Sequence, residues 1–207
     1  MTKSAFDLIH QNESNESKIV ASLERISQAF KVLLWSKGKN LSVTPIQAQI
    51  LIFLRYHTSD KRKVSYLANE LNVTKATISN TIKTLEQKKL IIKEPGKDDT
   101  RSYLIHLTSK GKSVAEEMSF FAQEIQHSIE RLPLSSKENL FSALLNIIYH
   151  LNQLGIISIQ RMCFTCIYYQ FQEHKQEHFC NLLNKTLADN ELKIDCPEHD
   201  LNHSATR

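Results

Sequence analysis

Apolar residues in the first part of the chain recur at steps of three and four, the period at which side chains share one face of an α-helix. The first stripe of this kind consists of Ile19, Leu23, Ile26, Phe30 and Leu33. It predicts an amphipathic helix over residues 16–37 that ends near Gly38. Residues 1–15 are mainly polar, and we expect them to be frayed.

A second helix begins with a strong local signal at residues 44–47. Thr44 can cap the helix, Pro45 suits its first turn, and Gln47 completes a capping box. The apolar residues that follow carry this helix to about His57. A basic loop over residues 59–63 separates it from the next helical pattern.

Two short helical patterns then meet at a tight turn over residues 72–74. The apolar face of the first is formed by Val64, Leu67, Ala68 and Leu71. Thr74 is placed to cap the second helix. The buried face of that second helix is predicted to consist of Ile78, Ile82 and Leu85.

The period changes to two after the second short helix. Residues 90–93 and 103–107 are predicted to form paired strands, joined by a charged tip over residues 95–101. A helix-turn-helix followed by a charged β-hairpin is typical of a winged helix. A plain helical hairpin with a solvated loop would account for either half alone, whereas their order favours DNA binding.

Two further helices are predicted after the hairpin. Thr108 is placed to cap a long one, which Pro133 ends. Its apolar stripe consists of Val114, Met118, Phe121, Ile125, Ile129 and Leu132. Ser135 and Glu138 form a second capping box, whose helix runs to Gly155. The small central domain cannot bury the stripes of these helices and of the first one alone, which favours a homodimer.

Composition narrows the class of protein. The chain has 207 residues, of which 41% are hydrophobic and 23% charged, as in ordinary globular proteins. The sequence contains no apolar run of about eighteen residues and no signal-peptide core, so we expect a cytoplasmic protein without a membrane span. The net charge of +4 divides into +6 for residues 1–155 and −2 for residues 156–207.

Basic residues gather around the two short helices and the hairpin, where their positive charge complements the negative phosphate backbone of DNA. The predicted base-edge contacts come from the exposed face of the second short helix: Lys75, Ala76, Thr77, Asn80 and Lys83. The predicted phosphate contacts are Lys61, Arg62, Lys63 and Lys97. Arg101, at the tip of the hairpin, is well placed to enter a narrow minor groove.

The central sequence resembles the MarR (multiple antibiotic resistance regulator) family over about residues 16–155. The resemblance is carried by Leu67-Ala68, Val73-Thr74, Thr77-Ile78-Ser79, Leu85-Glu86, Leu90-Ile91, Asp99-x-Arg101 and Ile105-His106-Leu107-Thr108-x-x-Gly111. It implies a dimeric transcription regulator, usually a repressor. It also implies that Arg101 enters the minor groove and that Asp99 orients it; the plainer interpretation of this pair is a surface ion pair.

The chain departs from that family pattern at two places. Lys89 stands where the family commonly has glycine before the Leu-Ile of the wing, so the helix end must use another cap or accept strain. The wing also has one arginine, Arg101, in place of a pair, which leaves fewer positive groups at its tip.

The tail over residues 156–207 contains all four cysteines of the chain. They are spaced Cys163-x2-Cys166-x13-Cys180-x15-Cys196. Such a set can bind one metal centre, either a zinc ion or an iron–sulfur cluster, with His178 or His199 as alternate ligands. A reversible dithiol sensor led by Cys163 and Cys166, or buried cysteines without a special role, are the other interpretations.

Local patterns in the tail predict some further structure. Leu182, Leu183 and Leu187 suggest a short helix, and residues 192–194 suggest a short strand. The aromatic residues of the tail are expected to form a small core. A module of about fifty residues with few aliphatic side chains would gain much stability from a metal.

The sequence therefore predicts a mainly α protein with a small β-wing. Residues 16–155 form a winged helix-turn-helix with flanking dimerisation helices, its DNA-reading core at 64–108, and residues 156–207 form a cysteine-rich module. We expect a repressor that binds an inverted-repeat operator as a homodimer, modulated by a metal or redox centre. The alternative is a structural zinc or dimer-contact tail with a small-molecule effector. No nucleophile elbow, glycine-rich phosphate loop or HExxH motif favours an enzyme.

Overall fold

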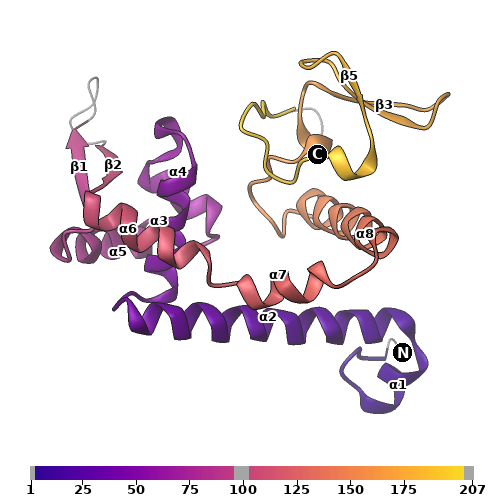
Figure 1. Cartoon of the computed structure of the whole chain (residues 1–207), viewed down its shortest axis with the longest axis horizontal. Coiled ribbons are helices and arrows are strands. Elements are labelled where there is room, and N and C mark those ends of the chain that lie inside the picture. The colour runs from indigo at the N-terminus through magenta and orange to yellow at the C-terminus, as the bar shows by residue number, and fades with distance from the viewer. Residues whose placement is uncertain (1–2, 96–102, 203–207) are drawn as a thin grey trace. The chain divides into compact units, whose positions relative to one another are not determined.

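The computed structural model describes residues 3–95 and 103–202, and it has the expected class: mainly helical, with a small β-hairpin wing (Figure 1). The chain divides into two compact units. The first consists of residues 1–59 and 81–126, and the second consists of residues 60–80 and 127–207. Among the residues that the structure describes, no helix combines the length and the apolar character that crossing a membrane requires.

The N-terminal segment is more ordered than its polarity suggested. A short helix, α1 (Leu8–Glu13), begins at Asp7, whose side chain accepts from the backbone N–H of His10. Helix α2 (Asn15–Asn40) follows. The sequence predicts that it ends near Gly38, and it ends two residues later, at Asn40. Gly38 lies inside this helix, and a side chain at that position would not fit, because a Cβ there would be 2.6 Å from the carbonyl oxygen of Val43. The glycine thus permits a close approach between backbones.

Helix α3 (Pro45–Tyr56) confirms the predicted capping box. The Thr44 hydroxyl accepts from the backbone N–H of Gln47, and the Gln47 side chain accepts from the backbone N–H of Thr44. Leu51 and Leu54 on this helix are almost completely buried. In the first unit, α3 packs against α2 and α6 (Ser109–Ser119).

A 3-10 turn, η1 (Ser59–Lys61), precedes the two short helices, α4 (Val64–Glu70) and α5 (Lys75–Gln87). Thr74 caps α5, as predicted, by accepting from the backbone N–H of Thr77 at 3.1 Å. At the end of α5, Lys89 takes the position at which the family commonly has glycine. Lys89 takes a φ of 59°, and the N–H of Leu90 donates to the carbonyl of Leu85 at 3.0 Å. Lys89 therefore adopts the left-handed conformation that glycine normally supplies.

The wing is an antiparallel pair, β1 (Ile91–Pro95) with β2 (Tyr103–Leu107), in which Ile91 pairs with Leu107. Thr108 then caps α6 as predicted. Figure 1 shows the hairpin next to the start of this helix. Gly111 permits that proximity, because a Cβ there would be 1.8 Å from the carbonyl oxygen of Leu90.

The predicted long helix to Pro133 is wrong: α6 ends at Ser119 and α7 (Gln123–Glu130) begins a new helix. At the break, the N–H of Phe121 donates to the carbonyl three residues earlier, at Met118, in place of the four-residue bond of an α-helix. The ring of Phe121 lies 6.1 Å from that of Phe30 on α2. This edge-to-face contact between distant residues is not visible in a local pattern.

Helix α8 (Leu134–Gln153) begins one residue before the predicted cap. The expected capping box of Ser135 and Glu138 is wrong, because Pro133 is the N-cap and no side chain of the described residues caps the helix. Pro133 has no N–H to satisfy, and its fixed φ leads directly into the first turn. The C-terminal end agrees with the prediction, since Gly155 follows the helix with a φ of 70°.

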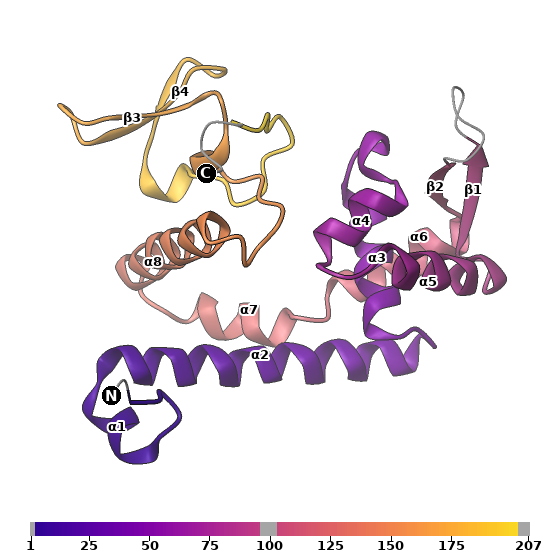
Figure 2. The same ribbon diagram turned by 180° about the vertical axis from the view of Figure 1, so that it is seen from behind.

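The tail packs on α8 within the second unit. A 3-10 turn η2 (Cys163–Thr165) is followed by a three-stranded antiparallel sheet and by η3 (Asp189–Glu191). The strands of that sheet are β3 (Tyr169–Gln172), β4 (Glu177–Cys180) and β5 (Lys185–Leu187). Figure 2 shows the strands on one side of α8. The core of this module joins Leu145 of α8 to Met162, Leu187 and Leu192 of the tail.

Two local predictions for the tail are wrong. Leu187 lies in strand β5, and Leu182 and Leu183 are exposed in the turn before it, so these leucines form no helix. Residues 192–194 form no strand. They lead to an isolated bridge between Asp195 and Arg161. In both stretches, pairing with distant residues overrides a weak local pattern.

Candidate functional site

Helix α5 presents two chemically different faces. Ile78, Ile82 and Leu85 are fully buried at 0% exposure, which confirms the predicted apolar face. The five predicted base-reading residues are all exposed: Lys75, Ala76, Thr77, Asn80 and Lys83. Most of these are short, so the helix backbone can approach a surface closely.

The predicted phosphate contacts are placed unevenly. Lys63 is exposed at the N-cap of α4, whereas Lys61 and Arg62 are half-buried in the loop before it. The described residues do not include Lys97, Asp99 and Arg101, so the predicted wing contact stays a prediction.

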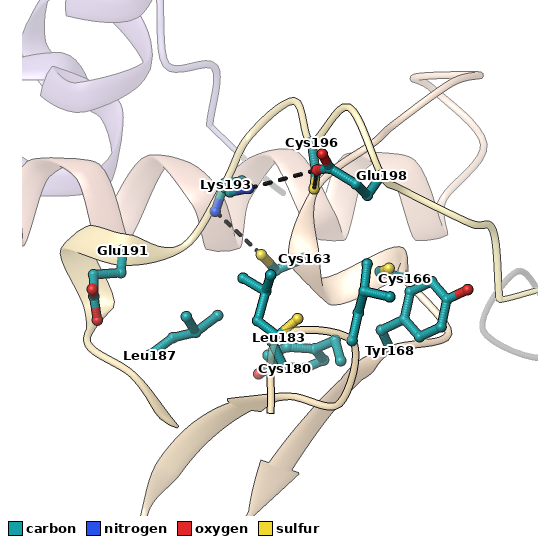
Figure 3. A pocket seen from close by; sticks show the side chains of 12 residues that line it. Cys163, Cys166, Tyr168, Cys180, Leu183, Leu187, Glu191, Lys193, Cys196 and Glu198 are labelled. Carbon is teal, nitrogen blue, oxygen red and sulfur yellow. Dashed lines mark hydrogen bonds and ion pairs between the residues drawn. The ribbon is translucent and has the colours of Figure 1, made fainter. Parts of the chain in front are cut away.

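The four cysteines converge although their spacing spans much of the tail. Cys163, Cys166, Cys180 and Cys196 all line one cavity of about 40 Å³, here called the cysteine pocket (Figure 3). Cys163 begins η2, Cys166 follows η2, Cys180 ends β4, and Cys196 lies in the loop after η3. Leu182, Leu183 and Leu187 add an apolar wall.

Backbone hydrogen bonds position the thiols of the cysteine pocket. The backbone N–H of Cys166 donates to the carbonyl of Cys163 at 3.0 Å, which closes the tight turn between the first two. The backbone N–H of Lys193 donates to Cys163 Sγ at 3.2 Å. On the far side, Cys196 Sγ lies 3.5 Å from a carboxylate oxygen of Glu198.

The surroundings favour neutral thiols. Burial raises the pKa of the Cys163 thiol, and the nearby thiols raise it further, although the N–H of Lys193 acts in the opposite direction. Burial also raises the pKa of Cys196. Several thiolates cannot stand together in such a pocket without a cation among them. A bound cation would reverse this preference.

The thiols surround the pocket without closing on its centre. Over residues 3–95 and 103–202, no three His, Cys, Asp or Glu side chains are grouped closely enough to hold a metal ion. The four cysteines are free of disulfides and half-buried. A metal would therefore require the thiols to move inward.

The two alternate ligands have other partners. His178 Nδ1 lies 2.7 Å from the Tyr169 hydroxyl, and its Nε2 lies 3.5 Å from Asp189. His199 Nε2 lies 3.0 Å from the Thr165 hydroxyl. Within the described part of the chain, neither histidine lines the cysteine pocket, so the geometry favours a four-cysteine set.

A buried ion-pair cluster escaped the sequence-based interpretation. Arg161 is 8% exposed and donates to Glu70 of α4, to Asp195 and to the Tyr66 hydroxyl. Burial alone lowers the pKa of Arg161, but the hydrogen bonds to Asp195 and Glu70 and their charges outweigh it, so the net shift is upward. The only sequence signal was a lone arginine among apolar residues, because its partners lie 34 and 91 positions away.

A second cavity of about 270 Å³ lies beside this cluster. Its lining includes Lys61, Tyr66, Asn152, Arg161 and His199. Burial lowers the pKa of His199, and the charges of Arg161 and Lys61 lower it further. Burial also raises the pKa of the Tyr66 hydroxyl. Besides apolar side chains such as Ile159 and Leu201, the cavity is thus lined by neutral polar groups and by the two cations Lys61 and Arg161.

Comparison with known structures supports the winged-helix interpretation. The chain is similar to the Staphylococcus aureus MepR–DNA complex, with 28% identity, a TM-score of 0.57, and coverage of 64% of this chain and 97% of MepR. MepR in its DNA-binding conformation gives 26% identity, a TM-score of 0.56, and coverage of 64% and 98%. A mutant form of MarR from E. coli, with 19% identity, a TM-score of 0.50, and coverage of 62% and 94%, agrees in fold.

Comparison with curated protein sequences gives no match. Residues 41–102 match the sequence profile described as the MarR family, a stretch that includes α3, α4, α5 and strand β1. Together with the structural likeness to MepR, this match agrees with the motifs found in the sequence. The winged-helix part of this chain is thus similar to the MarR family, whose sequence profile matches residues 41–102.

Proposed function

We propose that this protein is a DNA-binding transcriptional regulator that acts as a repressor on an inverted-repeat operator. The single observation that carries the proposal is the exposed polar and basic face of α5, opposite a fully buried apolar face. A helix of this kind, held by a cap and a preceding short helix, suits the major groove. The similarity to a MarR-family regulator determined in complex with DNA supports the same function.

Exposed apolar side chains support a homodimer. On α2, four of the five stripe residues stay exposed: Ile19 at 54%, Leu23 at 37%, Ile26 at 47% and Phe30 at 37%. On α8, Leu140 and Ile147 are exposed at 41% and 40%. Apolar stripes of this extent in one chain are typical of surfaces that a partner covers. A second copy of the chain is the simplest partner, because symmetric dimers are the commonest assemblies.

A two-fold dimer also gives the operator its expected form. Two copies of α5 related by a two-fold axis would contact two half-sites about one helical turn apart, roughly 34–36 Å. An operator of that kind reads as an inverted repeat. Repression follows when it overlaps a promoter.

The regulatory signal belongs to the second unit. We infer that a metal or redox centre at the cysteine pocket modulates DNA binding, since the four thiols of the tail line one cavity. A small-molecule effector is the second candidate, and the 270 Å³ cavity beside Arg161 offers it a place. In that case the tail serves as a structural zinc or dimer-contact module.

The DNA-binding proposal is tested with DNA that the protein selects from a random-sequence pool. Asn80→Ala removes a predicted base contact and should weaken binding of the selected sequence by about 1–3 kcal/mol while relaxing its preference at one position. Lys63→Ala removes a predicted phosphate contact and should weaken all sequences alike, with a salt slope reduced by about one. Arg101→Ala should weaken binding more than about ten-fold if the wing enters the minor groove.

Lys175→Ala, in the exposed turn between β3 and β4, serves as the control and should leave binding unchanged. Failure to enrich any sequence would refute the proposal. Sedimentation equilibrium tests the dimer: the wild-type chain should have twice the monomer mass, and Ile26→Glu on the α2 stripe should shift it towards the monomer.

A further inference from the structure

We propose that the four thiols of the cysteine pocket together hold one thiophilic metal centre, and that Arg161 couples its occupancy to the helix-turn-helix. The proposed metal site rests on the arrangement of the four thiols and does not depend on DNA binding. The coupling rests on the proposed DNA-binding function. The metal class is zinc or an iron–sulfur cluster, since both take four cysteine thiolates.

The arrangement of the thiols carries the first half of the proposal. Cys163 and Cys166 come from one tight turn, whereas Cys180 and Cys196 come from a strand end and a separate loop. Ligands delivered by three elements around one cavity are typical of a tetrahedral structural site. In Figure 3 the sulfur atoms of all four surround the pocket. Each side chain comes from the same unit of the chain.

The surroundings of the thiols suit thiolates once a cation is present. The Lys193 N–H already donates to Cys163 Sγ, and such bonds stabilise the negative charge of a metal-bound sulfur. Leu182, Leu183 and Leu187 line the pocket beside the thiols and offer no competing ligand atoms. On binding Zn²⁺, each thiol would lose its proton to solvent and form one zinc–sulfur bond, so binding releases protons.

The cavity is small, and the thiols of the described chain stand around it without meeting. Metal binding would therefore draw the loops that bear them inward. The loop with Cys196 is the one whose displacement has a consequence elsewhere, because two direct contacts tie it to Arg161.

Arg161 holds that loop through backbone and side chain. The backbone N–H of Cys196 donates to the Arg161 carbonyl at 2.9 Å, next to the bridge between Arg161 and Asp195. The guanidinium of Arg161 donates to both carboxylate oxygens of Asp195, at 2.6 and 2.9 Å. Any inward movement of Cys196 therefore displaces the partner of Arg161.

The other end of the guanidinium reaches the helix-turn-helix. Nη1 and Nη2 of Arg161 donate to the two carboxylate oxygens of Glu70 at 2.7 and 3.0 Å, and Nη1 also donates to the Tyr66 hydroxyl at 3.0 Å. Glu70 is the last residue of α4, and the turn that follows it ends at Thr74, the cap of α5. One planar side chain thus connects the cysteine loop to the start of the predicted DNA-reading helix.

Metal analysis tests the first half. Protein purified without oxygen should contain one metal centre per chain, as zinc in a colourless sample or as iron and sulfide in a brown one. Each of Cys163→Ser, Cys166→Ser, Cys180→Ser and Cys196→Ser should lower the affinity for Zn²⁺ more than ten-fold, whereas the control His174→Gln, in the same hairpin as Cys180, should not.

Cobalt provides a readout that does not depend on comparing variants. Co²⁺ added to the metal-free wild-type chain should give intense thiolate-to-cobalt bands and the visible spectrum of a tetrahedral four-sulfur site. Absence of both a native metal and Zn²⁺ uptake would overturn the site, as would a reversible disulfide among these cysteines that excludes metal.

Operator affinity tests the coupling. The probe is a DNA sequence selected by the wild-type protein, measured by fluorescence anisotropy with metal-loaded and metal-depleted samples. The wild-type dissociation constant should change by about five-fold or more between the two. In Arg161→Met and Glu70→Gln the ratio should approach one while metal content stays at the wild-type level. Arg55→Met, which breaks an exposed pair in the first unit, should keep the wild-type ratio.

The failures are distinguishable. A wild-type ratio of one, or an unaltered ratio in Arg161→Met and Glu70→Gln, would overturn the coupling and leave the metal site standing. Absence of any selected DNA would refute the proposed function, and metal content would still decide the site.

Discussion

Arg161 and Glu70 form a two-contact ion pair between residues 91 positions apart, with the side chain of Arg161 9% exposed and that of Glu70 18%. A pair of this kind is costly to break from one side, because the remaining charge stays buried without its partner. Asp195 and Tyr66 complete the cluster. The cluster ties the cysteine-rich tail to α4 within one compact unit.

Arg161→Met should therefore destabilise the protein by about 3–5 kcal/mol, measured by denaturant unfolding of the second unit. Arg55→Met removes a pair with Glu116 whose side chains are 38% and 57% exposed, and should cost at most about 1 kcal/mol. Equal losses in the two variants would show that the Arg161 cluster contributes no more than a surface pair.

Gly111→Ala should destabilise the first unit by more than about 2 kcal/mol, since its Cβ would collide with the Leu90 carbonyl, which is backbone and cannot rotate away. Gly155→Ala is the matched control. Its φ of 70° costs about 1 kcal/mol for alanine, but no atom of the described residues lies within 4 Å of the new Cβ. Thermal unfolding of both variants should rank Gly111→Ala as the more harmful.

Lys89→Gly should stabilise the protein by about 1 kcal/mol, because Lys89 has a φ of 59° that costs a side chain about 1–2 kcal/mol and costs glycine almost nothing. Lys83→Gly removes the same charge from the interior of α5 and should instead destabilise by about 1 kcal/mol. Opposite signs in urea midpoints are expected. A loss of stability in Lys89→Gly would contradict the strained helix end.

His199 should make stability fall on acidification. Burial lowers its pKa in the folded state, so the unfolded chain binds a proton more readily near the ordinary value of about 6.5. The contribution is complete above that value and is lost as the pH falls through the lower, folded pKa. Unfolding free energies of wild type and His199→Gln between about pH 7.5 and 5 should show a shallower acid decline in the variant. Parallel curves would show that another group causes the decline.

The sequence by itself determined the parts whose signals are local. The capping box of Thr44 and Gln47, the Thr74 cap and the buried face of α5 all lie within single helices or their first turns, and all are confirmed. Short-range hydrogen bonding and a helical period need no knowledge of the rest of the chain. The spacing of the cysteines likewise suggested that they act together.

Only the tertiary structure decided the features that depend on distant partners. The break after α6 occurs where Phe121 contacts Phe30. In the tail, Leu187 belongs to a strand because that strand pairs with β4, and the leucines before it lie in the connecting turn. The Arg161 cluster joins residues from three separate segments. Contacts across such separations compete with local preference, and no periodicity along the sequence records which of them wins.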